Sequence, residues 1–198
     1  MRNILLTGVG GQGTVLAAKV LAQAASDKGW AVRTAETIGM AQRGGSVVSH
    51  VRMGDAGDAP ASSLVMRGAA DIVIAFEPAE GARVLPYLAP DGVLVTASTG
   101  TQPVTAALSD DPYCAGEVVD ALRAQLPADR IVVVDDAALT AKAGTRRALN
   151  TVLLAAAIAQ GRIPISIDDL KRAIAACVKP RFVDMNLAAV DAVVAALA

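Results

Sequence analysis

A glycine-rich loop near the N-terminus carries the residues best suited to hold a ligand. A short apolar run, Ile4 to Thr7, leads directly into the sequence Gly8-Val9-Gly10-Gly11-Gln12-Gly13. Glycine adopts positive φ in tight turns and lets backbone N–H groups come close to a ligand. Between a strand and a helix, such a loop suits a phosphate or carboxylate bound at the N-terminus of the helix. The candidate ligand-binding residues of this loop are Gly8, Gly10, Gly11, Gln12 and Gly13.

The same loop and Glu36 together fit the dinucleotide fingerprint. In that pattern an acid at the end of the second strand binds a ribose hydroxyl, and Glu36 ends the second predicted strand. The segment after Glu36 does not continue as a helix, as a mononucleotide-binding half would. Three alternatives therefore remain open. They are a stand-alone NAD-binding oxidoreductase, a non-catalytic protein that binds an anion or nucleotide, and glycines that only let the strand and helix pack closely.

A second loop, from Gly39 to Ser46, places a cation, an amide and a hydroxyl among glycines. The Arg43 guanidinium could hold a carboxylate or phosphate through two parallel hydrogen bonds. A solvated arginine, or one that pairs across an interface, is the alternative. We expect the loop to face a partner or a substrate through Met40, Gln42, Arg43, Gly44, Gly45 and Ser46.

Polar residues also follow two later apolar runs. Asp135 and Asp136 end one run and Ser98-Thr99 follows another, and ligand sites of open α/β sheets collect where strands end. Capping the next helix is the simpler role for Asp136. Asn150 lies on an otherwise apolar helix and is expected to hydrogen-bond a neighbouring loop, although a partner contact is possible.

The histidine and the two cysteines indicate neither a catalytic residue nor a metal site. His50 is the only histidine and lies inside a predicted strand, which favours a structural histidine over a general base. Cys114 and Cys177 are two cysteines far apart, whereas an iron–sulfur cluster typically needs about four in short spacings. We expect each to be a partly buried thiol on its own helix.

Composition excludes several classes of protein. A net charge of −1 with 19% charged residues gives no basic surface for nucleic acid. No apolar run reaches the roughly 18 residues of a transmembrane helix, and the first one breaks at glycines, unlike a signal peptide. The chain is therefore expected to be cytoplasmic. Because 54% of the residues are apolar, we also expect exposed apolar surface and self-association when the chain is alone.

Strands and helices alternate along the chain, which predicts a three-layer α/β/α sandwich with a mixed, mostly parallel sheet of Rossmann-like type. The connection from Thr37 to Ser46 is too short for a parallel crossover, so the third strand should run antiparallel to the second. Residues 1–198 are expected to form a single domain with a helical part at about 137–198. The predicted strands are Ile4 to Thr7, Ala31 to Glu36, Val47 to Met53, Asp71 to Phe76, Val93 to Thr96 and Ile131 to Val134. The predicted helices are Thr14 to Lys28, one starting at Pro78, Thr145 to Gln160, Ile167 to Val178 and Met185 to Leu197.

The two loops also carry a resemblance to a known family. The first loop, Glu36 and the segment Gly39 to Arg52 resemble the smaller (beta) subunits of indolepyruvate:ferredoxin oxidoreductases, within the gamma-domain family of 2-oxoacid:acceptor oxidoreductases, also called pyruvate/ketoisovalerate oxidoreductases. The likeness continues more loosely through Asp71 to Glu77, the helix around Asn150 and the helix around Asn186. The second loop is the specific part, because related pyruvate and 2-oxoglutarate enzymes resemble it only partly.

The resemblance implies an accessory subunit that is inactive alone and binds no cofactor by itself. A larger subunit would carry thiamine diphosphate, Mg and the Fe–S clusters, with coenzyme A as co-substrate and ferredoxin as electron acceptor. This agrees with the sequence, which shows no Gly-Asp-Gly segment with a downstream Asn, the usual signature of a diphosphate–magnesium site. The implied reaction is oxidative decarboxylation of an aryl 2-oxoacid to an acyl-CoA.

Overall fold

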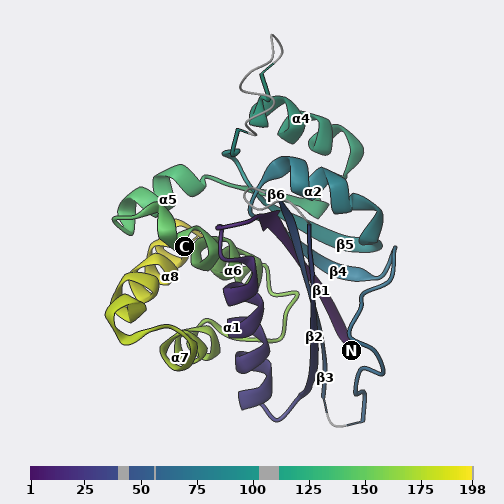
Figure 1. Cartoon of the computed structure of the whole chain (residues 1–198), viewed down its shortest axis with the longest axis vertical. Coiled ribbons are helices and arrows are strands. Elements are labelled where there is room, and N and C mark those ends of the chain that lie inside the picture. Colours follow the sequence, from purple (N-terminus) through teal and green to yellow (C-terminus); the bar gives the residue numbers. More distant parts are fainter. Residues whose placement is uncertain (40–44, 56, 103–111, 198) are drawn as a thin grey trace.

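Six strands form one mixed sheet in the order β2-β3-β1-β4-β5-β6 (Figure 1). The computed structural model describes residues 1–39, 45–55, 57–102 and 112–197. The strands are β1 Arg2–Val9, β2 Ala31–Ile38, β3 Ser46–Gly54, β4 Ala70–Ala75, β5 Leu88–Ala97 and β6 Ile131–Val134. The α-helices are α1 Thr14–Asp27, α2 Pro78–Val84, α4 Ala115–Gln125, α5 Asp136–Lys142, α6 Leu149–Ala159, α7 Ile167–Cys177 and α8 Val183–Leu197.

The third strand lies between the first two and runs antiparallel to both. β3 pairs with β2 from Ala31–Gly54 to Ile38–Val47 and with β1 from Arg2–Met53 to Val9–Ser46. The remaining pairs, β1–β4, β4–β5 and β5–β6, are parallel. The predicted antiparallel direction of β3 is therefore confirmed, and it follows from a connection too short to hold a crossover helix.

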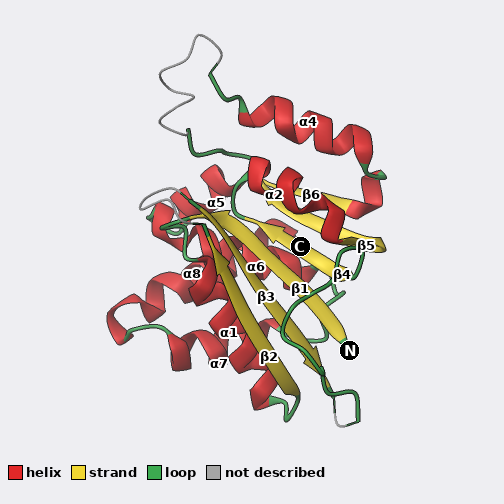
Figure 2. Ribbon diagram, turned by 45° about the vertical axis from the view of Figure 1, so that its right-hand side comes forward, coloured by secondary structure: helices red, strands yellow, loops and turns green. Residues whose placement is uncertain are grey.

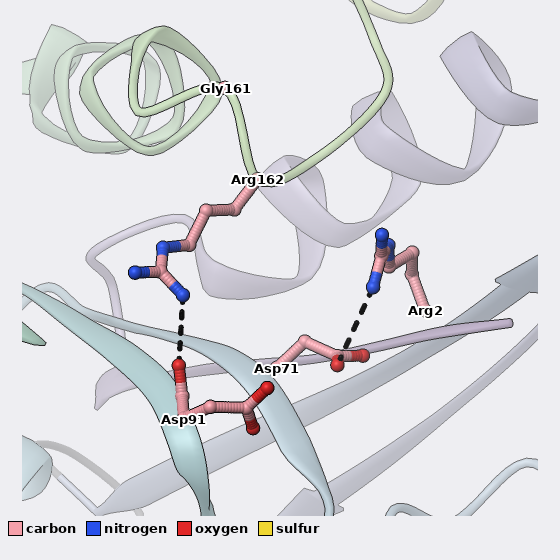
Figure 3. A pocket seen from close by; sticks show the side chains of 5 residues that line it. All are labelled: Arg2, Asp71, Asp91, Gly161 and Arg162. Carbon is pink, nitrogen blue, oxygen red and sulfur yellow. Dashed lines mark hydrogen bonds and ion pairs between the residues drawn. The ribbon is translucent and has the colours of Figure 1, made fainter.

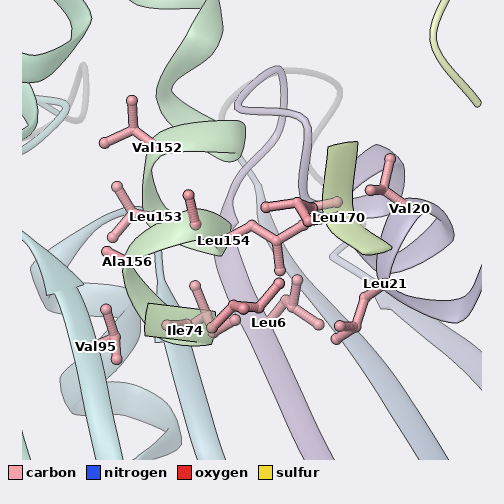
Figure 4. Close-up of a cluster of buried hydrophobic side chains, with 14 of the residues drawn as sticks. Leu6, Val20, Leu21, Ile74, Val95, Val152, Leu153, Leu154, Ala156 and Leu170 are labelled. Atoms are coloured by element: carbon pink, nitrogen blue, oxygen red, sulfur yellow. The ribbon is translucent and has the colours of Figure 1, made fainter. Parts of the chain in front are cut away.

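Helices cover both faces of the sheet, so the predicted three-layer arrangement is confirmed (Figure 2). α1, α5, α6, α7 and α8 pack on one face, while α2 and α4 pack on the other. The larger core joins Leu6, Ile74 and Val95 of the sheet to leucines of the helices, among them Leu21 and Leu154 (Figure 4). The central strand β4 is buried on both faces, which is why it reads as a continuous apolar run.

Element boundaries follow local signals that the sequence carries. Gly29 has φ 78° just after α1, as a left-handed C-terminal residue should. Ser166 and Asp169 form the predicted capping box of α7. The helix predicted from Thr145 begins instead as a short 3-10 turn, Arg146–Ala148, before α6. Among the described residues, no helix is both long and apolar enough to cross a membrane.

Candidate functional site

The carboxyl ends of the parallel strands bring the polar candidates to one edge of the sheet, which we call the carboxyl edge. The glycine loop follows β1, Glu77 comes soon after β4, Ser98-Thr99 follows β5, and Asp135-Asp136 follows β6. Strands β1, β4, β5 and β6 are mutually parallel, so these segments meet in space although they are far apart in sequence.

The first glycine loop has its left-handed residues at Gly11, with φ 99°, and at the helix N-cap Gly13, with φ 82°. Gly8 and Gly10 do not have positive φ, which corrects the expectation for these two positions. Gly8 is closely packed instead, because a Cβ there would lie 2.5 Å from Oε1 of Gln12 and 3.2 Å from Cβ of Phe76. A Cβ on Gly13 would lie 2.8 Å from Nδ2 of Asn150.

Gln12 links the glycine loop to two neighbouring segments through side-chain hydrogen bonds. Its Oε1 accepts the Val9 N–H at 2.9 Å, and its Nε2 donates to the Phe76 carbonyl at 3.2 Å. Nε2 also lies 3.3 Å from Oγ1 of Thr101, to which it donates. One amide therefore ties the segments that follow β1, β4 and β5, a role that its place in the sequence motif does not reveal.

The base of the second loop is bound to the first loop. The Gly10 N–H donates to the Gly45 carbonyl at 2.9 Å, and the Gly39 N–H donates to the Ser46 carbonyl at 2.8 Å. The Ser46 hydroxyl donates to Oε2 of Glu80 at 2.5 Å. Of the other predicted contact residues, Met40, Gln42, Arg43 and Gly44 lie outside the described residues. The structure thus joins the two glycine loops at Gly45 and Ser46.

Two buried acids at the start of α2 belong to the same edge, although the sequence alone did not mark them as site residues. Glu77 caps α2 by accepting the Glu80 N–H at 3.0 Å, and it also accepts the Tyr113 hydroxyl. Burial, followed by the bond to Glu77, raises the pKa of Tyr113, so this phenol stays protonated. A local signal existed, because Glu-Pro-x-Glu is a helix-start pattern with proline at the first position.

Asp136 is the most highly coordinated side chain of the carboxyl edge. It has no exposed surface and accepts bonds from Ser98 N and Oγ at 2.9 and 3.0 Å and from Thr99 N and Oγ1 at 3.0 and 2.6 Å. Nη1 of Arg146 completes the set at 2.7 Å. Burial alone would raise the pKa of Asp136, but the bonds from Thr99, Arg146 and Ser98 outweigh it and hold the pKa below its ordinary value.

The neighbouring aspartate has the capping role. Asp135 Oδ1 accepts the Ala138 N–H at 3.0 Å, which makes Asp135 the N-cap of α5. The simpler role expected for Asp136 was therefore wrong, because its side chain points into the fold toward the end of β5. The proximity of Ser98-Thr99 to this strand end is as expected.

His50 and Asn150 make the structural contacts expected of them. Nδ1 of His50 accepts the Val65 N–H at 3.1 Å, and burial lowers the pKa of the imidazole, which favours the neutral form. Nδ2 of Asn150 donates to the Gly13 carbonyl at 3.4 Å, so the loop expected to bind this amide is the glycine loop.

Glu36 lies far from the glycine loop. It is exposed on β2, and β3 separates β2 from β1, so two strand spacings of about 4.8 Å each stand between them. The dinucleotide fingerprint needs the acidic strand beside the glycine-loop strand. The predicted pairing of Glu36 with the glycine loop therefore does not match this topology.

An open groove of about 380 Å³ lies beside the glycine loop at the carboxyl edge. Its described lining combines two arginines, three uncharged polar residues, two leucines and two glycines, and contains no acid. The lining residues are Gly11, Gln12, Gly13, Leu16, Thr101, Arg146, Arg147, Leu149 and Asn150.

Comparison with known proteins places the chain among redox enzymes. The sequence model of the family described as pyruvate ferredoxin/flavodoxin oxidoreductase matches residues 3–196. The chain belongs to this family. It is 37% identical to indolepyruvate oxidoreductase subunit IorB of Archaeoglobus fulgidus, over 94% of this chain and 90% of that protein. It is 34% identical to the protein of the same name from Pyrococcus horikoshii, over 96% and 92%. The family expected from the two loops is thus confirmed.

Solved structures of other oxidoreductase subunits share the fold. The keto/oxoacid ferredoxin oxidoreductase gamma subunit of Geobacter sulfurreducens superposes with a TM-score of 0.70 at 23% identity, covering 100% of this chain and 99% of that one. The pyruvate oxidoreductase subunit PORC of Thermotoga maritima gives 0.66 at 21% identity, covering 97% and 94%. At these identities the comparison concerns the fold alone.

The residues of this family member do not fit an iron–sulfur cluster. Cys114 is exposed just before α4, whereas Cys177 ends α7 on the opposite face of the sheet. Within the described ranges, no group of three or more His, Cys, Asp or Glu side chains could hold a metal ion. Cys114 is also more exposed than the partly buried helical thiol expected from sequence.

Proposed function

We propose that this chain is the accessory subunit of a 2-oxoacid:ferredoxin oxidoreductase and that the substrate is indolepyruvate. The observation that carries the proposal is similarity over nearly the whole chain, at 33–37% identity, to four proteins named indolepyruvate oxidoreductase subunit IorB. In the proposed reaction the 2-oxoacid and coenzyme A give an acyl-CoA and carbon dioxide, and the two electrons released pass to ferredoxin.

The cofactors are proposed to lie on a larger partner subunit. Thiamine diphosphate with Mg²⁺ supplies the electron sink for decarboxylation and Fe–S clusters carry the electrons. The separated cysteines of this chain support that division. The chain's own part would be to close and shape the partner's site, and we propose that the assembled complex is cytoplasmic.

The carboxyl edge is the proposed surface of contact with the larger subunit. Gly10 to Gly13 and the second loop, from Met40 to Ser46, would form it together, whereas Gly8 is buried beneath them. The hydrogen bond from Gly10 to Gly45 supports this, because it fixes the base of the second loop against the first. Ile38, at the end of β2, is 65% exposed at the same edge. Apolar surface of this kind supports the further proposal that the chain self-associates when it is alone, which light scattering over a range of concentrations would test.

The experiment compares the chain alone with the chain co-expressed with the larger subunit of its source organism. Each is assayed with indolepyruvate, coenzyme A, thiamine diphosphate and a viologen dye. We expect turnover only from the complex. Turnover by the pure chain, or stoichiometric NAD binding by it, would refute the accessory role, while a complex active on other 2-oxoacids alone would refute the substrate.

A further inference from the structure

Among the ion-paired arginines of the described residues, Arg146 has the most deeply buried partner. That partner, Asp136, is 0% exposed, whereas the acids paired with Arg83 and Arg172 are 7% and 11% exposed. Nη1 of Arg146 is bound to the fully buried Asp136, and Nη2 donates to Oγ1 of Thr99 at 2.8 Å. The Arg146 side chain is nevertheless 55% exposed. A guanidinium has five N–H donors, so three remain after these two bonds.

This arrangement prepares the guanidinium for a second anionic partner. An arginine held in one rotamer loses less conformational entropy when it binds than a freely moving one does. Asp136 balances one positive charge, while Arg147 lines the same groove and makes no ion pair among the described residues. The groove therefore keeps about one uncompensated positive charge beside a guanidinium that is already positioned.

The surroundings suit a protein side chain. Leu16 and Leu149 give the groove apolar walls, and Gly11 leaves its mouth open, since a Cβ there would meet nothing within 4 Å. Val15, in the first turn of α1, and Ile38 are exposed apolar residues at the same end of the sheet. Arginine is enriched at the energetically important positions of protein interfaces, so two arginines beside apolar groove walls suit a protein partner.

We propose that an acidic side chain of the larger subunit inserts into this groove and pairs with Arg146, while Arg147 steers the approach. The inference rests on the proposed function, because it names the chemistry by which the partner is recognised. Asp136, Ser98 and Thr99 act as positioning residues, since they hold the guanidinium that makes the contact.

The test measures assembly of the full-length chain with the larger subunit at about 50 mM and about 500 mM salt. Arg147→Glu should slow association about tenfold at low salt and much less at high salt, because steering by exposed charges is screened. Arg146→Gln should raise the Kd at least about 30-fold through faster dissociation, and Arg146→Lys should recover part of that loss. Thermal unfolding of each variant checks the fold, and Arg147→Glu decides the question if the Arg146 variants do not fold.

The matched control is Arg123→Glu on α4, an exposed arginine whose ion pair is with Asp120. It should change neither rate by more than about twofold. The inference is overturned if Arg123→Glu slows association as much as Arg147→Glu does. It is also overturned if Arg147→Glu and the folded Arg146 variants all assemble like the wild type. Either result leaves the proposed function intact. Saturable pyrophosphate binding by the isolated chain together with arginine-independent assembly would make the groove a small-ligand site and also overturn it. A wild-type chain that never assembles overturns both proposals.

Discussion

Two arginine–aspartate pairs lie at opposite ends of the parallel strands and differ in burial, in distance and in the number of hydrogen bonds that the aspartate accepts. At the carboxyl edge, Asp136 is fully buried and lies 2.7 Å from Arg146. At the amino ends of the parallel strands, which we call the amino edge, Asp71 lies 3.8 Å from Arg2, and the two side chains are 30% and 50% exposed (Figure 3). The first pair sits where four strand-following segments converge, and the second is partly exposed in a small pocket.

The difference shows that burial decides how strongly an ion pair holds separate segments of the chain together. Asp136 receives four hydrogen bonds from the segment after β5, so its charge fixes that segment and Arg146 together. The amino-edge pocket, of about 150 Å³, also contains Arg162, but that guanidinium donates to the Asp91 carbonyl, not to a carboxylate (Figure 3). Solvated pairs of that kind contribute about 0–1 kcal/mol, whereas breaking a buried pair costs several times more.

The largest expected effect comes from removing the buried member of the carboxyl-edge pair. Asp136→Ala should lower the free energy of unfolding by about 3–5 kcal/mol, because it leaves the Ser98 and Thr99 donors without their acceptor. Asp135→Ala is the matched control and should cost about 1 kcal/mol, the loss of a helix cap. Urea unfolding at neutral pH measures both, and equal effects would show that Asp136 is no more than a second cap.

Acid should weaken the same cluster. The pKa of Asp136 is lower in the folded chain than in the unfolded chain, so its charge stabilises the fold above the unfolded pKa of about 3.9. That stabilisation is lost as the pH falls through the folded value. The stability difference between the wild type and Asp136→Asn should therefore be constant above about pH 5 and shrink below about pH 4. A difference that stays constant down to pH 2 would contradict this.

Two glycines extend the comparison to the backbone. Gly13 at the carboxyl edge and Gly161 beside the amino-edge pocket both have positive φ, but only Gly13 has a close neighbour, Asn150, where a Cβ would be. Gly161→Ala should cost about 1 kcal/mol from backbone strain alone, and Gly13→Ala about 2–3 kcal/mol because the Asn150 side chain must also move. Thermal unfolding of the two variants gives the ordering, and a costlier Gly161→Ala would reverse it.

The smallest effect is expected from the solvated pair. Arg2→Ala should change the free energy of unfolding by less than about 0.5 kcal/mol, because its partner Asp71 stays hydrated and keeps the Asn3 N–H at 2.7 Å. A loss above 1 kcal/mol in the same urea measurement would mean that the two edges are more alike than their burial indicates.

Much of the fold could be read from local patterns. The apolar runs gave the strands, Ser166 and Asp169 gave the start of α7, and the short connection from Thr37 to Ser46 gave the direction of β3. Reading Glu36 as a ribose ligand failed because the fingerprint assumes that the second strand lies beside the first. The insertion of β3 between them is a property of the whole sheet.

By itself the sequence determined the order of the strands and of most helices, the glycine loops and the family, since periodicity, turn residues and short motifs act over a few neighbouring positions. Only the tertiary structure decided which of two adjacent aspartates points inward. It also brought Arg146 and Thr99, which lie 10 and 37 positions away in the sequence, into hydrogen-bonding contact with Asp136. It also decided that Gly10 binds Gly45 and that Gln12 reaches Phe76. Such contacts depend on how the packed helices and strands place their ends, because a carboxylate can be buried only where converging backbones supply enough donors to replace water.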